Sequence, residues 1–399
     1  MAKKSTLETF EKAVKEYSVD LAEIEALQNG TWPAWPSGSD VVDILTGIGG
    51  LPKGRIVECY GKPSSGKSAL FMTAAGKIQK LGKIVILLDF ERTFDPAWAK
   101  TLGMDPADSK TFLWVQSKEL RTTEQGFNLL YRFLDSDFAD DIGMIIWDSL
   151  AGSTPAAIAD KDEVEDTTRR AARASVLSDE LPRLAEKLRS ENHQATIAFV
   201  NQVRVNMNAM SFGPKETTPG GWAFEHQASL RLGIKHLGFE TKSLVDEFTL
   251  EKKIEKIGQK VLFTIEKTKH GQRGRSAEAI FMYQKGFDNI RTLVGLAIKR
   301  GDFKKVSAQK SAVPEGLTAD GKGVTGTEAT LLTYFNNSPE SYDLLRKHMV
   351  DDINRIYWEK VNTTNSVVAD GAAEESDNGL NEIKNLNKSH LVDLSALEE

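Results

Sequence analysis

The segment Gly61–Ser68 constrains the fold of this chain more than any other feature. Its letters, G-K-P-S-S-G-K-S, follow an apolar run that ends at Tyr60 and precede a helix-forming stretch, which is the setting of a phosphate-binding loop. Gly61 and Gly66 let the backbone N–H groups turn toward an anion, and the positive end of the next helix adds to the attraction. A chance glycine-rich turn is the alternative, but the match in its strand–loop–helix context predicts a nucleotide site.

The side chains of this loop predict contacts with the phosphates and with a metal. Lys67 is expected to reach the β- and γ-phosphates, and the Ser68 hydroxyl is expected to ligate Mg²⁺. Ser64 and Ser65 lie in the part of the loop that surrounds the phosphates. The loop therefore predicts a nucleotide and Mg²⁺ as cofactors.

Acidic residues follow two further apolar strands. Asp148 ends the run Met144–Trp147 and would hold a water on Mg²⁺. Glu91 follows a similar run and is placed to orient or deprotonate the attacking water, whereas Asp89 is predicted to be structural. Such residues often only cap the next helix, but ligands gather at the carboxyl ends of strands in open α/β sheets. Together with the phosphate loop they predict a hydrolase site.

Alternating hydrophobic patterns give the fold class. Strands are expected at 55–60, 84–89, 143–148, 196–201, 230–235, 261–267 and 278–283, and helices at 67–80, 124–134 and 171–189. The early strands alternate with helices, as in a parallel sheet, and the later strands follow one another, as in an antiparallel extension. The chain is therefore predicted to be an α/β protein with a mixed, mostly parallel central sheet.

The net charge of −6 is confined to one end of the chain. Between 362 and 399, eight acidic residues and two lysines account for all of it, so residues 1–361 are neutral overall. This segment is poor in aromatic residues and is predicted to be largely disordered. Solvation alone explains such a tail, and electrostatic competition for a basic surface elsewhere on the protein is the alternative.

The N-terminal part predicts a short amphipathic helix and no export signal. Leu7, Phe10, Val14 and Tyr17 share one helical face, which would pack on the same domain or on a neighbouring subunit. No apolar stretch approaches the roughly 18 residues of a membrane span. The single cysteine, Cys59, cannot form an intrachain disulfide and is expected to be a buried, inert thiol. These features predict a cytoplasmic protein without a membrane partner.

Five separated motifs resemble, in order and spacing, those of the RecA family of recombinases. They are Gly49–Glu58, Gly61–Ser68, Asp95–Pro96, Asn201–Arg204 and Glu216–Gly221. The resemblance implies an N-terminal helix and linker at 1–38 that contacts another subunit, a RecA-like ATPase and DNA-binding core at 39–298, a small C-terminal α/β domain at 299–361 and an acidic tail at 362–399. The compact N-terminus and the tail favour the phage branch represented by the UvsX recombinase.

The resemblance also implies the activity. Family members are DNA-dependent ATPases that form helical filaments on single-stranded DNA and catalyse homologous pairing and strand exchange in recombination and repair. The implied partners are single-stranded and double-stranded DNA, further copies of the chain, and single-strand-binding and loader proteins. The small C-terminal domain is a candidate gateway for duplex DNA.

Nucleotide roles follow by position from the resemblance. Glu91 is implied as the catalytic base, Gln202 as the sensor of the γ-phosphate, and Asp95 as part of the nucleotide site. Trp98 replaces a family tyrosine that stacks on adenine, and an indole stacks at least as well. Two alternatives remain for Tyr283: it covers the other face of the base, or it is a core aromatic. Two also remain for Lys267 and Lys269: they reach a neighbour's γ-phosphate, or they form an exposed basic strand end.

DNA contacts are implied in two loops, at about 157–170 and 204–220. In the second loop Met207 matches a residue that wedges between base triplets, and Phe212 is offered to bases or buried beneath the loop. The other implied DNA-binding residues are Arg173, Arg204, Gly220 and Gly221. The first loop is acidic before it turns basic, which leaves its register on DNA open. Trp222 and His226 also depart from the family pattern.

Two other functions remain as alternatives. A ring-shaped replicative helicase shares this ATPase core, but it would need a sizeable N-terminal domain and an arginine finger, where this chain has about 38 preceding residues and a lysine pair. A regulatory ATP-binding scaffold would make no DNA contact. The methionines and phenylalanine of the second loop argue against the scaffold.

Overall fold

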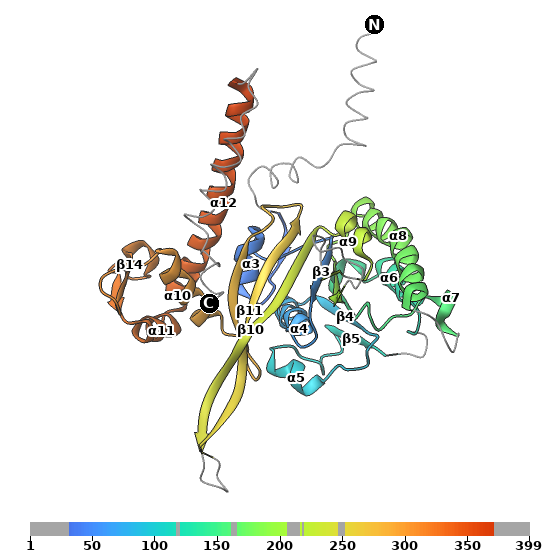
Figure 1. Ribbon diagram of the computed structural model, residues 1–399, viewed down its shortest axis with the longest axis horizontal. Helices are drawn as coiled ribbons and strands as arrows, with labels where there is room; N and C mark the ends of the chain where they lie inside the picture. Colours follow the sequence, from blue (N-terminus) through green and yellow to red (C-terminus); the bar gives the residue numbers. More distant parts are fainter. Residues whose placement is uncertain are drawn as a thin grey trace.

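A nine-stranded sheet forms the centre of the molecule (Figure 1). The computed structural model describes residues 32–116, 120–160, 166–205, 216–217, 219–245 and 252–370. The strand order is β13-β12-β11-β10-β3-β7-β6-β4-β5. From β10 to β5 all neighbours are parallel, and β11, β12 and β13 add an antiparallel extension. The predicted mixed, mostly parallel sheet is confirmed.

The strands of this sheet have the following bounds: β3 (Ile56–Gly61), β4 (Ile84–Asp89), β5 (Phe112–Val115), β6 (Ile142–Asp148), β7 (Thr196–Gln202), β10 (Leu230–Val245), β11 (Lys252–Thr268), β12 (Ser276–Met282) and β13 (Gly286–Phe287). Two short ribbons lie outside the sheet. They are β1 (Ala34–Trp35) with β2 (Leu51–Pro52), and β8 (Arg204–Val205) with β9 (Glu216–Thr217).

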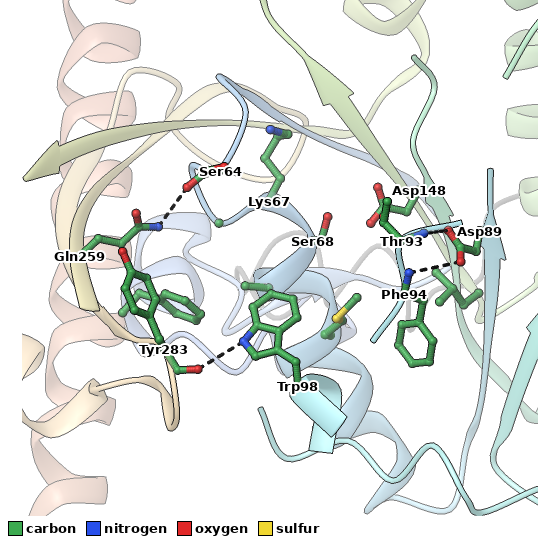
Figure 2. A pocket seen from close by; sticks show the side chains of 15 residues that line it. Ser64, Lys67, Ser68, Asp89, Thr93, Phe94, Trp98, Asp148, Gln259 and Tyr283 are labelled. Atoms are coloured by element: carbon green, nitrogen blue, oxygen red, sulfur yellow. Dashed lines mark hydrogen bonds between the residues drawn. The ribbon is translucent and has the colours of Figure 1, made fainter. Parts of the chain in front are cut away.

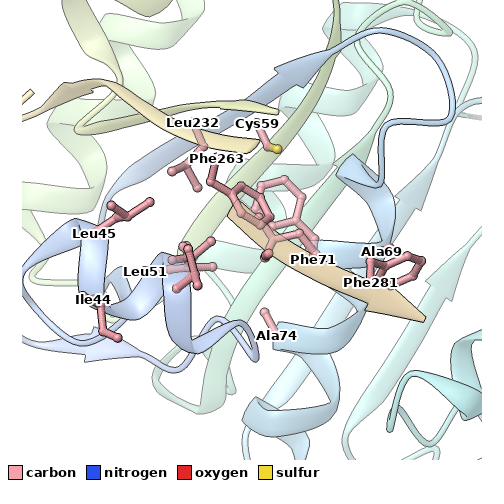
Figure 3. Close-up of a cluster of buried hydrophobic side chains, with 14 of the residues drawn as sticks. Ile44, Leu45, Leu51, Cys59, Ala69, Phe71, Ala74, Leu232, Phe263 and Phe281 are labelled. Atoms are coloured by element: carbon pink, nitrogen blue, oxygen red, sulfur yellow. The ribbon is translucent and has the colours of Figure 1, made fainter. Parts of the chain in front are cut away.

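Helices cover both faces of the sheet. One face carries α3 (Asp40–Thr46), α4 (Lys67–Gln79), α5 (Pro96–Thr101) and α10 (Asn289–Arg300), and the other carries α6 (Thr123–Leu134), α8 (Asp166–Ser190) and α9 (Gly221–Gln227). Successive side chains of a strand point to opposite faces of the sheet and so pack in both helix-covered layers. Val57 and Cys59 point into the first layer, and Ile56 points into the second. Figure 3 shows the first layer, to which Phe71 of α4 and Phe263 of β11 both belong.

The remaining elements are short connections and a small C-terminal unit. The connections are η1 (Ala139–Asp141) and α7 (Ala156–Ala159). The C-terminal unit consists of β14 (Lys304–Lys305), β15 (Ser311–Val313), η2 (Glu315–Leu317), β16 (Val324–Gly326), α11 (Glu328–Asn337) and α12 (Pro339–Asp370). Its buried side chains, among them Phe303, Leu331 and Met349, belong to the same hydrophobic core as α4.

Three expectations differ from the structure. The strands expected at 230–235 and 261–267 extend into a long β10–β11 hairpin that projects beyond the sheet (Figure 1), because register shifts break the apolar alternation that would have marked it. The edge strand β5 was not predicted because two of its four residues, Leu113 and Trp114, are exposed. Helix α12 continues to Asp370, past the expected boundary at 361, because no glycine or proline interrupts it before Gly371.

Several predictions lie outside the described residues. The amphipathic helix with Leu7, Phe10, Val14 and Tyr17 is one, and the acidic tail beyond Asp370 is another.

A buried ion pair joins the C-terminal unit to the core. Arg346 of α12 contacts Asp40 at 3.0 Å and Asp43 at 2.6 Å, both on α3. The Tyr342 hydroxyl also donates to Asp40. Burial raises the pKa of Asp43 to about 6, and Arg346 acts in the opposite direction. Arg346 therefore stabilises a carboxylate that burial would otherwise neutralise.

We expect Arg346→Met to lower the free energy of unfolding by about 3 kcal/mol at pH 7, since it leaves a buried carboxylate without its cation. Because the folded-state pKa of Asp43 is raised, protonation of this carboxyl group stabilises the folded state. This stabilisation is fully present below the ordinary pKa of 3.8 and is lost as the pH rises through about 6. The decrease in the free energy of unfolding caused by Arg346→Met should therefore be smaller at pH 5 than at pH 7. Urea denaturation at both pH values measures it. Lys347→Met on the exposed side of α12 is the control, and equal losses in the two variants would contradict the assignment.

Candidate active site

The phosphate loop joins β3 to α4 in the expected geometry. A Cβ atom at Gly61 would lie 2.3 Å from the Ile234 carbonyl oxygen, so only glycine fits there. Gly66 caps the N-terminus of α4 with a φ of 99°, which strongly favours glycine. The first helical residue is Lys67, so the helix points its positive end at the loop.

Two polar groups of the loop, the Ser65 hydroxyl and the Lys67 ammonium, are placed to bind an anion. The Ser65 hydroxyl is buried and has no hydrogen-bond partner. The Lys67 ammonium donates to the Lys62 carbonyl at 2.8 Å, and burial lowers its pKa. A phosphate between these groups would accept the Ser65 hydrogen bond and favour the charged form of Lys67. The residues present therefore fit a nucleotide triphosphate.

A cavity of about 340 Å³ opens beside the loop (Figure 2). Trp98 of α5 and Tyr283, which follows β12, both line it, and the Trp98 indole donates to the Tyr283 carbonyl at 3.2 Å. Gln259 of β11 closes another side through its amide, which donates to the Ser64 carbonyl at 3.4 Å. Two aromatic side chains and the phosphate loop thus line one cavity, which suits a base at one end and phosphates at the other.

Ser68 and Asp148 form the candidate magnesium site. The two side chains are hydrogen-bonded, and burial raises the pKa of Asp148 to about 6, with Glu91 and Asp89 adding to the rise. Within the described ranges no cluster of three metal-ligating side chains occurs. Mg²⁺ usually takes one or two protein oxygens and completes its shell with phosphate and water, so Ser68 and Asp148 would suffice to hold it. A cation here would bring the pKa of Asp148 back down.

Glu91 is held by two donors at the edge of the site. The Ser149 hydroxyl and the Gln202 amide, the latter at 3.1 Å, both donate to Glu91 Oε1. Glu91 therefore has a fixed orientation beside the residue predicted to sense the γ-phosphate. Neighbouring Asp89 accepts hydrogen bonds from the Thr93 and Phe94 amides and the Trp114 indole, which is the structural role predicted for it.

Two predicted contact residues are engaged elsewhere. The Asp95 carboxylate does not line the cavity; it caps α5 by accepting from the amides of Ala97 and Trp98, at 2.8 and 3.2 Å. Its effect on the nucleotide would be indirect, through the position of Trp98. Arg173, expected at a DNA phosphate, is buried and donates to the Ser153 carbonyl at 2.8 Å. Helix α8 places it beneath the segment after β6, so in this structure it fixes that segment.

The second DNA loop is described only at its two ends. Backbone pairing of β8 with β9 brings Arg204 opposite Thr217. Gly220, with a φ of 82°, caps α9, and Gly221 is the first residue of that helix. Met207 and Phe212 lie outside the described residues, as do 161–165 of the first loop. Residues 157–159 and 166–170 of the first loop belong to α7 and α8.

Lys267 and Lys269 lie far from the cavity of their own chain. Lys267 pairs with Arg231 near the start of β10, whereas the phosphate loop follows the opposite end of β3. Lys267 is eight positions along β11 from Gln259 at the cavity, which corresponds to about 26 Å of extended strand. The Lys267 ammonium donates to the carbonyls of Glu225 and His226 at the end of α9.

Sequence reasoning missed two polar residues of the site, Ser149 and Gln259, and one buried acid outside the cavity, Glu58. Ser149 directly follows the predicted metal residue Asp148, and its hydroxyl at a strand end was an available signal. Gln259 lies within a strand and had no signal in the sequence. Glu58, a single acid within an apolar strand, is fully buried, and this unusual placement could have drawn attention to it.

The fold and site define a P-loop ATPase whose parallel sheet has an antiparallel extension. A model of the RecA N-terminal domain matches residues 2–288. Protein RecA of Borrelia hermsii strain HS1 / DAH is 30% identical over 328 residues, covering 82% of this chain and 85% of that protein. Protein RecA of Aquifex aeolicus strain VF5 is 29% identical over 343 residues, covering 85% and 87%. The crystal structure of the RadB recombinase aligns with a TM-score of 0.44 and 17% identity, over 63% of this chain and 97% of that chain.

The chain belongs to the RecA family. As a member of this family it is a DNA-dependent ATPase of recombination and repair that forms filaments and catalyses strand exchange.

We expect Trp98→Ala to weaken ATP binding about fivefold, which corresponds to the roughly 1 kcal/mol of an aromatic stacking contact. Trp98→Phe keeps a stacking ring and loses only the hydrogen bond to Tyr283, so it should bind nearly as well as wild type. Titration of a fluorescent ATP analogue without DNA measures both affinities. Wild-type affinity in Trp98→Ala would remove this residue from the base site.

Glu91→Gln should reduce ATP hydrolysis at least about 100-fold, because an amide cannot accept the proton of the attacking water. ATP binding and ATP-dependent assembly should persist, since the phosphate loop is unchanged. Lys67→Ala is the contrasting variant and should lose ATP binding itself. Steady-state phosphate release separates the two, and a wild-type rate in Glu91→Gln would show that another group acts as the base.

Proposed function

We propose that ATP in this family member is bound between two subunits of the filament, with Lys267 and Lys269 supplied by the neighbour. The observation that carries the proposal is the position of the lysine pair: Lys267 contacts the end of α9 and lies about 26 Å of extended strand from Gln259 at the cavity of the same chain. Two cations at one edge of the subunit and a phosphate site at the opposite edge match when identical subunits stack head to tail.

The lysine pair has the properties that such a junction needs. Burial lowers the pKa of Lys267 to about 8, with Lys269 and Arg231 adding to the effect, and burial also lowers the pKa of Lys269. Crowded cations of this kind gain stability when a phosphate approaches. The alternative of an ordinary exposed strand end fits less well, because Lys267 is only partly exposed and is oriented by two carbonyls.

Within one subunit the proposed roles follow the cavity. Lys67 and the N-terminus of α4 would hold the phosphates, and Ser68 with Asp148 would hold Mg²⁺, which supplies charge neutralisation at the phosphates. Glu91 would accept a proton from the attacking water. Gln202, which contacts Glu91, would transmit the state of the site to the chain that follows it.

Nucleotide and DNA would be coupled through the residues after β7. Gln202 ends this strand, and the amide of Val203 donates to the Gly61 carbonyl at the start of the phosphate loop. The chain then enters the segment with Arg204, Met207 and Phe212, which we propose to contact single-stranded DNA together with Gly220 and Gly221. Because binding free energies are linked, DNA must tighten ATP binding as much as ATP tightens DNA binding.

The finer assignments rest on the sequence resemblance. We place the protein in the phage-type, UvsX-like branch, in the cytoplasm, with single-strand-binding and loader proteins as accessory partners. None of the helices in the described part of the chain could cross a bilayer. Assembly on single-stranded DNA coated by a single-strand-binding protein tests the need for a loader: slow assembly that a loader accelerates supports this branch, and unaided assembly at the bare-DNA rate contradicts it.

Electron microscopy with single-stranded DNA and a non-hydrolysable ATP analogue tests the proposed assembly. A helical filament that requires both ligands supports it. Closed rings would favour the helicase alternative, and particles without DNA would favour a regulatory scaffold.

Filament assembly should weaken as the pH rises through about 8, because Lys267 loses its proton in the free subunit and must regain it to meet a phosphate. At pH 9 we expect about tenfold weaker assembly than at pH 7. Lys267→Arg should remain charged and assemble equally at both pH values. Lys260→Arg, on the same strand and paired with Glu240, is the control and should behave as wild type. Light scattering measures assembly, and a pH-independent wild type would contradict the role of Lys267.

A further inference from the structure

A buried carboxylate at the centre of the sheet joins two parts of the proposed machinery. Glu58 of β3 is fully buried, and each of its oxygens has a different partner. Oε1 accepts from the Asn201 amide at 2.6 Å, and Oε2 accepts from Arg231 Nε at 2.6 Å. Burial raises the pKa of Glu58, while Arg231 and the Asn201 hydrogen bond oppose that rise.

On one side of Glu58, Asn201 ties together the two ends of the proposed DNA loop. Its Oδ1 accepts from the Gln202 backbone amide at 2.9 Å, where the loop begins. Its Nδ2 donates to the Pro219 carbonyl at 2.8 Å, where the loop ends, in addition to Glu58. The Asn201 side chain is itself fully buried. A change in the spacing of the loop ends must therefore move the group that Glu58 binds.

On the other side, Arg231 connects Glu58 to the surface that carries the lysine pair. Arg231 Nη1 contacts Glu225 of α9 at 3.2 Å, and the backbone carbonyl of Glu225 accepts from Lys267. Arg231 and Lys267 are also opposite one another in the β10–β11 register. A continuous set of contacts therefore runs from Gln202, which donates to Glu91, through Glu58 to Lys267 of the lysine pair.

We propose that Glu58 is a positioning residue that couples the DNA loop and nucleotide sensor of one subunit to the lysine pair that it presents to the next. The proposal rests on the proposed function and deepens it by naming the link through which one junction influences another. Glu58 and Asn201 are fully buried, so a displaced partner leaves a polar group unsatisfied, and displacement of Asn201 is transmitted to Arg231.

The test is Glu58→Gln, which keeps the size of the side chain but has one acceptor oxygen in place of two. Binding of a fluorescent ATP analogue and hydrolysis without DNA should match wild type. DNA stimulation of hydrolysis should fall about tenfold, within the range of typical coupling energies, and the Hill coefficient for ATP should approach one. If Glu58 were merely structural, Glu58→Gln would change ATP binding and hydrolysis without DNA together with DNA stimulation and the Hill coefficient.

Two further variants keep the test decisive. Asp43→Asn removes another fully buried carboxylate of an ion pair, so it should lower stability while leaving DNA stimulation and the Hill coefficient unchanged. Arg231→Lys retains a cation beside Glu58 but cannot bridge Glu58 and Glu225 at once, so it should reproduce the loss of coupling even if Glu58→Gln fails to fold.

Wild-type stimulation and cooperativity in Glu58→Gln or Arg231→Lys would overturn the inference and leave the proposed function standing. Loss of coupling in Asp43→Asn to the same extent would also overturn it, since general destabilisation would then be the cause. A wild-type protein without DNA stimulation or cooperativity would contradict the proposed function, and the inference would fall with it.

Discussion

The path of strand β11 across the sheet is the constraint on which the rest of the structure depends. Near the middle of β11 Gln259 contacts the phosphate loop, whereas Lys267 and Lys269 lie at and just beyond its C-terminal end. The strand is held in place by β10 and β12, so it cannot bring Gln259 and the lysine pair to one nucleotide. A site that uses both the phosphate loop and the lysine pair must therefore be built from two copies of the chain.

Burial shifts the pKa values of several charged groups at the proposed ligand sites. The pKa of Lys67 is lowered and that of Asp148 is raised to about 6, both chiefly by burial. A bound phosphate would favour the charged form of Lys67, and a bound cation would favour the charged form of Asp148. Burial also lowers the pKa of Lys267 to about 8, and the phosphate of a neighbouring subunit would favour its charged form.

Much of the site could be predicted because its chemistry is local in the sequence. The phosphate loop, Asp148 and Glu91 each follow an apolar strand, and parallel strands bring such ends to one edge. Trp98 and Tyr283 came from the family resemblance, and the structure places both at the cavity. Contacts between distant segments could not be predicted this way. Strand order and register determine the contact of Gln202 with Glu91. They also determine the position of Glu58 between Asn201 and Arg231.

The fold was predicted where hydrophobic alternation is regular and missed where it is not. Strands β3, β4, β6 and β7 are buried on both faces and were placed to within a residue or two at each end. The outer part of the β10–β11 hairpin has solvent on both faces and several register shifts, so its pattern resembles a loop. Asp95 shows a related limit, because a residue of one of the family-like motifs is a helix cap whose carboxylate accepts from the Trp98 amide.

A subunit-mixing experiment tests the shared site most directly. Lys67→Ala lacks a working phosphate site, and the double variant Lys267→Ala with Lys269→Ala lacks the bridging cations, so each should be inactive alone in DNA-stimulated hydrolysis. In a mixed filament, a double-variant cavity next to a Lys67→Ala subunit has every group it needs. If the nucleotide site is shared between two subunits, mixing should restore part of the activity. Mixtures that stay inactive at every ratio, although both variants enter the same filaments, would contradict it.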